Sequence, residues 1–209
     1  MAYVFKAKHP FIPPTEDKQI ETLPFLEASR EILILIDYLG PSFLKSAFHR
    51  TRADIDGNIT TLQNKYNSNP DLYQTLNSMI SDELHSSQTS ATVALLWLKR
   101  GLEFIFHFCE KLIAESVDHK PHTQSLCDIT LKSYELSLKR FHSFIVRGLF
   151  YLVAHILPSR KDFFKLLAGG QDCKEEEVEK ELRMFVEGLD PNLKIINELY
   201  INMGKNEDC

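Results

Sequence analysis

The chain contains no run of apolar residues long enough to cross a membrane. In its 209 residues the longest apolar stretches, near residues 32–36 and 149–157, fall far short of the roughly eighteen residues that a transmembrane helix needs. Residues 1–14 mix lysine, histidine and three prolines, and they lack the apolar core of a signal peptide. We therefore expect a cytoplasmic protein without a membrane span.

Cysteine is scarce, and the basic residues form no block. The 24 Lys and Arg are spread along a chain of formal net charge −5, which argues against nucleic acid as a partner. Because no two cysteines are closely spaced, we expect free thiols rather than disulfides. The cysteines are Cys109, Cys127, Cys173 and Cys209.

Motifs for catalysis and for metal binding are missing as well. The sequence has neither a glycine-rich phosphate loop nor a serine elbow. Segment 54–58 (DIDGN) resembles a calcium loop, but carboxylates are absent at the first and twelfth loop positions. His119 and His122 have a zinc-like spacing without a full ligand set. The sequence therefore predicts no enzyme, no cofactor and no metal site.

Phenylalanine, in contrast, is abundant, and the apolar residues recur with a helical period. Fourteen Phe residues can enclose more apolar volume than packing alone requires. Apolar residues at three- and four-residue steps predict an all-α fold with about 7–8 helices, and no useful alternation of the β type is present. The predicted helices cover 23–39, 54–66, 70–85, 89–114, 131–156, 161–167, 175–185 and 191–203.

Four polar or aromatic residues could form a ligand site, although each also has a simpler interpretation. Asp54 and Asn58 are four residues apart and share one face of a predicted helix, but Asp54 could merely cap that helix. Trp97 is the only tryptophan and could be a core residue. His142 lies among apolar residues and could be an ordinary buried histidine.

Taken together, four segments resemble the glycolipid transfer protein family, in the same order and at similar separations. The most specific parts are the Asp-x-x-x-Asn helix, the Trp-Leu-Lys-Arg-Gly block and the distant histidine. The likeness extends from residue 17 to about residue 203. The segments are 17–28 (DKQIETLPFLEA), 53–60 (ADIDGNIT), 94–102 (ALLWLKRGL) and 134–142 (YELSLKRFH).

The resemblance implies a fold and a function. The fold would be a two-layer helical sandwich, formed by one domain over residues 1–209 with an irregular N-terminal extension over 1–16. The function would be to carry one glycosphingolipid between membranes without chemical conversion. The protein would act as a monomer and bind membrane surfaces transiently and peripherally.

The resemblance also implies roles for individual residues. Asp54 would accept the ceramide amide N–H, His142 would donate to the amide carbonyl, Asn58 would bind sugar hydroxyls, and Trp97 would stack its face on the first sugar ring. A charge-assisted bond to Asp54 would be stronger than a neutral one. The residues expected to line the apolar pocket are Val93, Leu138, Phe150, Phe163 and Phe185.

The chain departs from the family pattern at two places. Thr61 stands where the family usually has a lysine three residues after the Asn, and Lys65, one turn further on, is a candidate replacement. Phe144 stands where the family often has a tryptophan two residues after the His. We expect Phe144 to contact membrane, without the indole N–H that suits interfaces.

Two alternative functions stay open. A relative that carries ceramide 1-phosphate has an arginine at the position of Trp97, because a phosphate favours guanidinium contacts over a ring face. Trp97 and Thr61 therefore favour a glycolipid, whereas Lys65, Lys99 and Arg100 leave some cationic capacity. A lipid-sensing adaptor would need the same pocket as a carrier.

Overall fold

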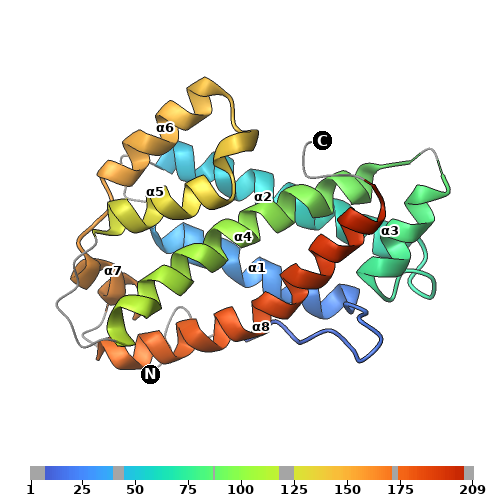
Figure 1. The fold of residues 1–209 in the computed structure, drawn as a ribbon, viewed down its shortest axis with the longest axis horizontal. Coiled ribbons are helices and arrows are strands. Elements are labelled where there is room, and N and C mark those ends of the chain that lie inside the picture. The colour runs from blue at the N-terminus through green and yellow to red at the C-terminus, as the bar shows by residue number, and fades with distance from the viewer. Residues whose placement is uncertain (1–7, 40–44, 87, 118–124, 171–173, 205–209) are drawn as a thin grey trace.

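The computed structural model describes residues 8–39, 45–86, 88–117, 125–170 and 174–204 (Figure 1). Within these ranges the chain forms eight α-helices and a short 3-10 helix, and β-structure is limited to one isolated bridge between Glu21 and Thr75. The expected all-α fold is confirmed. The elements are α1 (Thr22–Leu39), α2 (Lys45–Ser68), α3 (Leu76–Leu84), α4 (Ser90–Val117), α5 (Leu126–Leu136), η2 (Lys139–Phe141), α6 (Phe144–His155), α7 (Arg160–Leu167) and α8 (Glu175–Asn202).

Helix α4 occupies the middle of the fold. It packs against α2, α8, α5 and α3, while α1 packs against α2 and α7. In Figure 1, α4 and α8 lie in front of α1 and α2, so these helices form two layers. The apolar face of α4 is buried between them, as expected for the predicted central helix. Its buried residues include Leu95, Leu98, Leu102, Ile105 and Leu112.

The second predicted central helix, over 131–156, is wrong, because the chain forms two helices there with η2 between them. Near the end of α5 the hydroxyls of Ser133 and Ser137 each donate to the backbone carbonyl four residues earlier, at 2.8 and 2.7 Å. Side-chain bonds of this kind compete with the backbone pattern and bend helices. Ser143 then caps α6 by accepting from the N–H of Val146 (3.4 Å). The apolar repeat runs through the break and does not reveal it.

Helix α3 begins later than the predicted range of 70–85. The carbonyl oxygen of Asn69 accepts the N–H of Leu72 (3.2 Å), so this segment forms a turn instead of the first turn of a helix. The cap of α3 is Thr75, whose hydroxyl accepts the N–H of Ser78 (3.1 Å). Asn-Pro is compatible with both a turn and a helix start, and sequence alone did not separate them.

Helix α8 is one helix, although the sequence predicted two, over 175–185 and 191–203. Pro191 lies inside it and cannot donate to the carbonyl four residues earlier, which costs about 3 kcal/mol or more. Leu189 and Leu193, on either side of the proline, are both buried. Burial of each leucine contributes about 1.5–3 kcal/mol, enough to offset the proline.

The N-terminal segment, residues 8–16, contains no helix and is anchored in the core by Phe11. The Phe11 ring makes edge-on contacts with Phe25 of α1 (centroids 5.5 Å apart) and Phe185 of α8 (5.7 Å). Such T-shaped pairs add about 0.5–1.5 kcal/mol to the effect of burial. The segment predicted as an irregular extension is thus packed against two helices over its described part.

Gly188 allows this segment to approach α8 closely. A Cβ atom at position 188 would lie 2.7 Å from the carbonyl oxygen of Phe11, too close for any other residue without movement of the backbone. One turn further on, the buried amide of Asn192 donates to the carbonyl oxygen of Ile12 (2.9 Å). The absence of a side chain at Gly188 allows the close approach, and the buried hydrogen bond from Asn192 holds the segment against α8.

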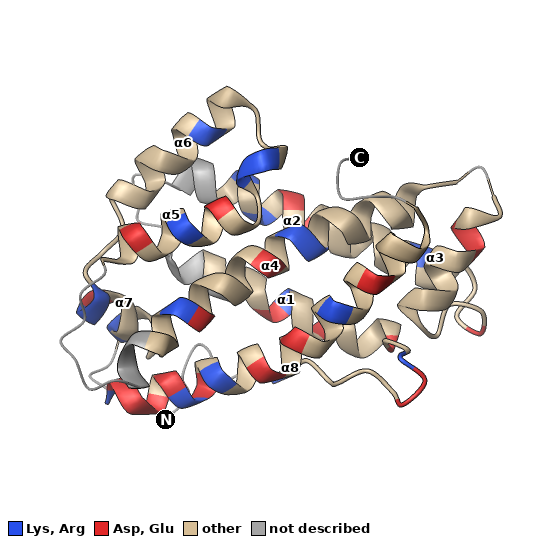
Figure 2. Cartoon of the chain, viewed as in Figure 1, with Lys and Arg blue, Asp and Glu red and all other residues tan. Residues whose placement is uncertain are grey.

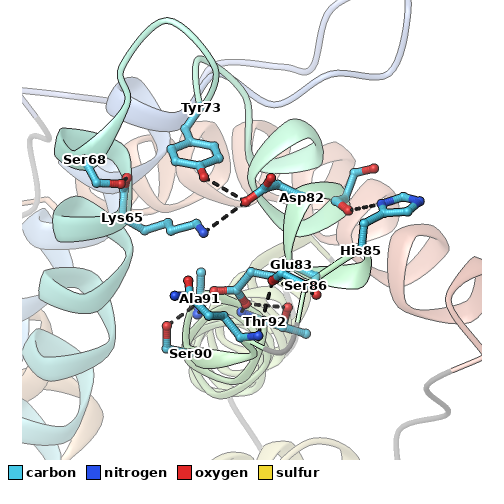
Figure 3. Close-up of polar contacts among 12 residues, drawn as sticks. Lys65, Ser68, Tyr73, Asp82, Glu83, His85, Ser86, Ser90, Ala91 and Thr92 are labelled. Atoms are coloured by element: carbon cyan, nitrogen blue, oxygen red, sulfur yellow. Dashed lines mark hydrogen bonds and ion pairs between the residues drawn. The ribbon is translucent and has the colours of Figure 1, made fainter.

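Glu83 joins α3 to the start of α4 (Figure 3). Its buried carboxylate accepts the backbone N–H groups of Ala91 (3.0 Å) and Thr92 (2.8 Å) and the hydroxyl of Thr92 (2.8 Å). Burial by itself would raise the pKa of this carboxyl, but the hydrogen bonds from Thr92 and Ala91 outweigh it and hold the pKa below the ordinary 4.5. A negative charge at a helix N-terminus is also favourable.

We expect Glu83→Gln to lower the free energy of unfolding by about 1.5–3 kcal/mol, because the amide loses the charge and cannot accept all three bonds. Urea denaturation at pH 7 measures this difference. Glu198→Gln is the control, since Glu198 forms an exposed ion pair with Lys18 (2.9 Å). Such a pair contributes at most about 1 kcal/mol. Equal effects of the two substitutions would contradict the role given to Glu83.

Candidate functional site

Asp54 and Asn58 lie in the interior of α2, on the side away from its buried residues. Ile59 and Leu62 are buried beneath the helix, whereas Asp54 is exposed and Asn58 is partly exposed. Because α2 begins at Lys45, Asp54 does not cap it. Within the described part of the chain, neither polar side chain has a hydrogen-bond partner, so both can bind a ligand.

Thr61 and Lys65, further along α2, are both engaged within the protein. The Thr61 hydroxyl donates to the carbonyl oxygen of Gly57 (2.9 Å). The Lys65 ammonium donates to the Asp82 carboxylate of α3 (3.1 Å) and lies 4.8 Å from the centroid of the Tyr73 ring (Figure 3). Lys65 therefore bonds to α3.

Trp97 presents part of its indole ring at the surface of α4. It is 38 % exposed, and Val93, one turn earlier, is exposed as well. The ring meets Phe141 of η2 edge-on, with centroids 6.4 Å apart. The guanidinium carbon of Arg100 lies 4.7 Å from the Trp97 ring and 3.4 Å from the Phe141 ring. These contacts hold the indole in place while leaving it partly open to solvent.

The two cations that follow Trp97 in the sequence point into the protein. Arg100 is only 1 % exposed and lies against the two aromatic rings. Lys99 is also buried, and its ammonium lies 3.3 Å from the Glu103 carboxylate. A cation over an aromatic ring is attracted by the negative face of the ring. Neither charge is presented at the surface beside Trp97.

His142, directly after η2, contacts Tyr134 of α5. The Tyr134 hydroxyl oxygen and the Nδ1 atom of His142 are 2.9 Å apart. Tyr134 is buried, and its ring stacks on Phe150 of α6 at a centroid distance of 3.7 Å. Burial lowers the pKa of His142 below its ordinary 6.5, and the charge of Arg147 lowers it further. The imidazole is thus neutral at pH 7.

A row of aromatic rings leads from His142 into the core. Neighbouring rings in the row are 3.7 to 6.4 Å apart, centroid to centroid. Two of the residues expected in the apolar pocket belong to it, and its three further members were not identified as site residues from the sequence. The row consists of Tyr134, Phe150, Phe104, Phe108 and Phe163.

The other residues expected in the pocket lie apart from this row. Leu138 is partly buried in the connection between α5 and η2. Phe185 packs against Phe11, and Val93 lies on the exposed side of α4 near Trp97. Phe104 and Phe108 were overlooked because α4 is apolar on most faces, and its sequence does not indicate which rings meet.

Helix α6 exposes an apolar surface. Its sequence contains Arg147 but no acidic residue, and Figure 2 shows it almost uncoloured by charge. Phe144, at its first position, is 88 % exposed. Isolated exposed apolar residues are common, but a contiguous group marks an interaction surface. The group consists of Phe144, Ile145, Val146, Leu149, Leu152 and Ile156.

Two negative findings apply to the described residues. None of the helices there combines the length and hydropathy needed to cross a bilayer. In the same part of the chain, no cluster of three or more His, Cys, Asp or Glu side chains could hold a metal ion. His119 and His122 lie outside the described residues.

We expect His142 to make stability depend on pH. Its folded pKa is below that of the unfolded chain, so its stabilisation is complete above about pH 6.5 and is lost as the pH falls toward the folded value. The free energy of unfolding, measured between about pH 5 and pH 8, tests this expectation, because that interval brackets the ordinary pKa of about 6.5. The wild-type curve should fall more steeply than that of His142→Gln. The exposed His155 provides the control variant, His155→Gln, and a constant difference between wild type and His142→Gln would contradict the expectation.

Comparison with known proteins identifies the fold. Residues 20–169 match the family described as "Glycolipid transfer protein (GLTP)". A glycolipid transfer protein of Danio rerio is 35 % identical over 206 residues, covering 96 % of each chain. Among solved structures, the fungal glycolipid transfer protein HET-C2 superposes with a TM-score of 0.81 at 29 % identity, covering 96 % of this chain and 97 % of that one. FAPP2, described as selecting simple glycosphingolipids with this fold, gives 0.82 at 26 % identity and covers 98 % of both chains.

The all-α fold of the described residues is therefore shared with proteins named as glycolipid transfer proteins. The family match covers residues 20–169, and the relative from Danio rerio is 35 % identical over nearly the whole chain. The chain belongs to the glycolipid transfer protein family.

Proposed function

We propose that this protein carries one glycosphingolipid between membranes without altering it chemically. The observation that carries the proposal is the Trp97 ring, partly exposed on α4 and held from the protein side by Arg100 and Phe141. An indole face suits the C–H face of a sugar ring. Its relatives from Danio rerio and from a fungus are named as glycolipid transfer proteins, which supports the same class of ligand.

The headgroup and the amide would bind along the neighbouring helices α2 and α4, beside the contact of Trp97 with Phe141 of η2. Trp97 would stack on the first sugar, and Asn58 would bind sugar hydroxyls through its free amide. Asp54 would accept the ceramide amide N–H, and His142 would donate to the amide carbonyl. Helix α2 packs along α4, so the two helices that carry three of these residues are neighbours.

The hydrocarbon chains would enter the apolar interior along the aromatic row. Phe150 lies next to Tyr134 and hence close to His142, and Phe163 lies at the far end of the row. A lipid whose amide binds His142 would therefore have its chains directed toward apolar rings. Val93, Leu138 and Phe185 would complete the lining at other points.

A phosphorylated ceramide is disfavoured by the arrangement of charge. Lys65, Lys99 and Arg100 left this alternative open, but each is engaged within the fold. A phosphate needs cations that are free to form short, charge-assisted bonds. The lipid-sensing adaptor would share the pocket, and movement of lipid between vesicles distinguishes it from a carrier.

We expect Asp54→Val to abolish transfer of galactosylceramide between vesicles while leaving thermal unfolding nearly unchanged. Loss of a charge-assisted bond removes about 1.5–3 kcal/mol, or about one to two decades of affinity. Asp54 is exposed and unpartnered among the described residues, so its loss should hardly affect the fold. The matched control is Asp56→Val, which makes the same change on another side of α2.

The same assay tests the lipid class. Wild-type protein should move galactosylceramide faster than ceramide 1-phosphate. The reverse order would refute the headgroup assignment, and equal loss of transfer in both Asp variants would refute the role of Asp54.

We further propose that α6 is the surface that contacts membrane. Its exposed apolar residues carry no acidic neighbour within the helix, and Arg147 adds a positive charge. This apolar surface is next to His142, so the lipid site would lie close to the bilayer during docking. The protein would act as a monomer. It would act in the cytoplasm, where free thiols such as Cys109 and Cys127 persist.

We expect Phe144→Ser to weaken binding to phosphatidylcholine vesicles by about tenfold or more, because burying a phenylalanine contributes about 1.5–3 kcal/mol. Co-sedimentation with vesicles measures this binding. Ile201→Ser is the control, since Ile201 is an exposed apolar residue of α8 rather than α6. If the two variants bound equally, α6 would not be the docking surface.

A further inference from the structure

The side chain of Tyr134 is fixed directly behind His142. It is buried, and its ring stacks on Phe150 with only 9° between the ring planes. Its hydroxyl oxygen lies 2.9 Å from the Nδ1 atom of His142. A stacked, buried tyrosine has little rotational freedom, so its hydroxyl defines a fixed point to which the imidazole can bond.

The protonation of the two groups limits how this bond can form. Burial raises the pKa of Tyr134, so the phenol keeps its proton at pH 7. Burial and the charge of Arg147 lower the pKa of His142, so the imidazole is neutral. The charges of Arg147 and Lys139 lower the pKa of Tyr134 and Tyr151 raises it, but burial is the largest effect and the net pKa is raised. A neutral imidazole has one N–H and one acceptor nitrogen. The hydrogen bond at Nδ1 decides whether Nδ1 or Nε2 carries the proton.

If the phenol donates to Nδ1, the imidazole proton resides on Nε2. The Nε2–H then faces away from Tyr134 and can donate to a ligand. In the opposite arrangement Nδ1–H would donate to the phenol, and Nε2 would be an acceptor that cannot bond a carbonyl oxygen. The phenol would keep its proton in both cases, but only the first makes His142 a donor to an amide carbonyl.

We propose that Tyr134 is a positioning residue for lipid binding: its hydroxyl donates to Nδ1 of His142, holds the imidazole as the Nε2–H tautomer and orients that N–H toward the lipid amide carbonyl. This inference rests on the proposed function, because it takes His142 as the amide donor. Tyr134 itself touches the imidazole and Phe150, and its effect on the lipid is indirect.

Tyr134→Phe tests the proposal because it removes only the hydroxyl and keeps the ring that stacks on Phe150. Nitrogen NMR of protein labelled in its imidazole rings reports the tautomer, and His142→Gln assigns the His142 signals. In wild type we expect Nδ1 to be unprotonated and Nε2 protonated. In Tyr134→Phe we expect a mixture of tautomers and about a tenfold loss of galactosylceramide transfer, as for one hydrogen bond.

Tyr66→Phe is the matched control, since it removes a hydroxyl from a partly buried tyrosine of α2 that the proposed site does not use. It should leave both the tautomer and the transfer rate as in wild type. In a His142→Gln background, Tyr134→Phe should cause no further loss, because its effect passes through the imidazole.

Three results would overturn the proposal. One is a wild-type imidazole protonated at Nδ1. Another is Tyr134→Phe with unchanged tautomer and transfer. The third is lower transfer with an unchanged tautomer and a lower unfolding temperature, which would mean that Tyr134 is only structural. Failure of the proposed function is distinguishable, since it would appear as absence of glycolipid transfer in wild type, whatever the tautomer.

Discussion

The break in helical geometry between α5 and α6 is the constraint on which the candidate site depends. In a continuous helix Tyr134 and His142 would be about 12 Å apart along the axis, since each residue advances the chain by about 1.5 Å. The chain leaves the helix after Leu136 and turns through η2, and the two side chains come within hydrogen-bonding distance. The same turn brings Phe141 against Arg100 and Trp97. The hydroxyls of Ser133 and Ser137 bond to backbone carbonyls just before this turn.

A second constraint concerns charge. Removing cations from water is costly unless they are paired or lie against aromatic rings. Lys99 bonds to Glu103, Arg100 lies against two aromatic rings, and Lys65 bonds to Asp82. These three cations are therefore engaged within the fold. In the proposed site a ring, a carboxylate and an amide would instead offer many weak, directional bonds to hydroxyls.

The fold class followed from the apolar period, because long helices with buried faces leave a regular record in the sequence. The positions at which helices break or continue could not be predicted from this period. Apolar residues continue through the break near Ser137, and Asp190-Pro191 has the form of a helix start although it lies inside α8. At the first position local side-chain bonds accompany a break that the apolar repeat does not record, and at the second the burial of leucines on either side of the proline overrides the local signal.

The candidate site shows the same limit. Trp97 and His142 could be named from motifs, but Tyr134 could not, since its partnership requires the turn through η2. The ion pair between Lys65 and Asp82 could not be predicted either, because the sequence of α2 does not indicate that Asp82 of α3 lies beside it. The roles of Asp54, Asn58, Trp97 and His142 toward a lipid stay predictions.

The contact between Gly188 and Phe11 has a consequence for how this sequence can change. Position 188 accepts no side chain only because the backbone of Phe11 lies against it, and Asn192 fixes that backbone through Ile12. An alanine at 188 would be strongly disfavoured with the N-terminal segment in place, but in a chain that lacked it alanine would be favoured over glycine by about 0.5–1 kcal/mol, as in other helix interiors. The effect of a substitution at position 188 therefore depends on the N-terminal segment around Phe11, so the two are epistatic. The order in which substitutions arise decides which sequences can be reached by single changes.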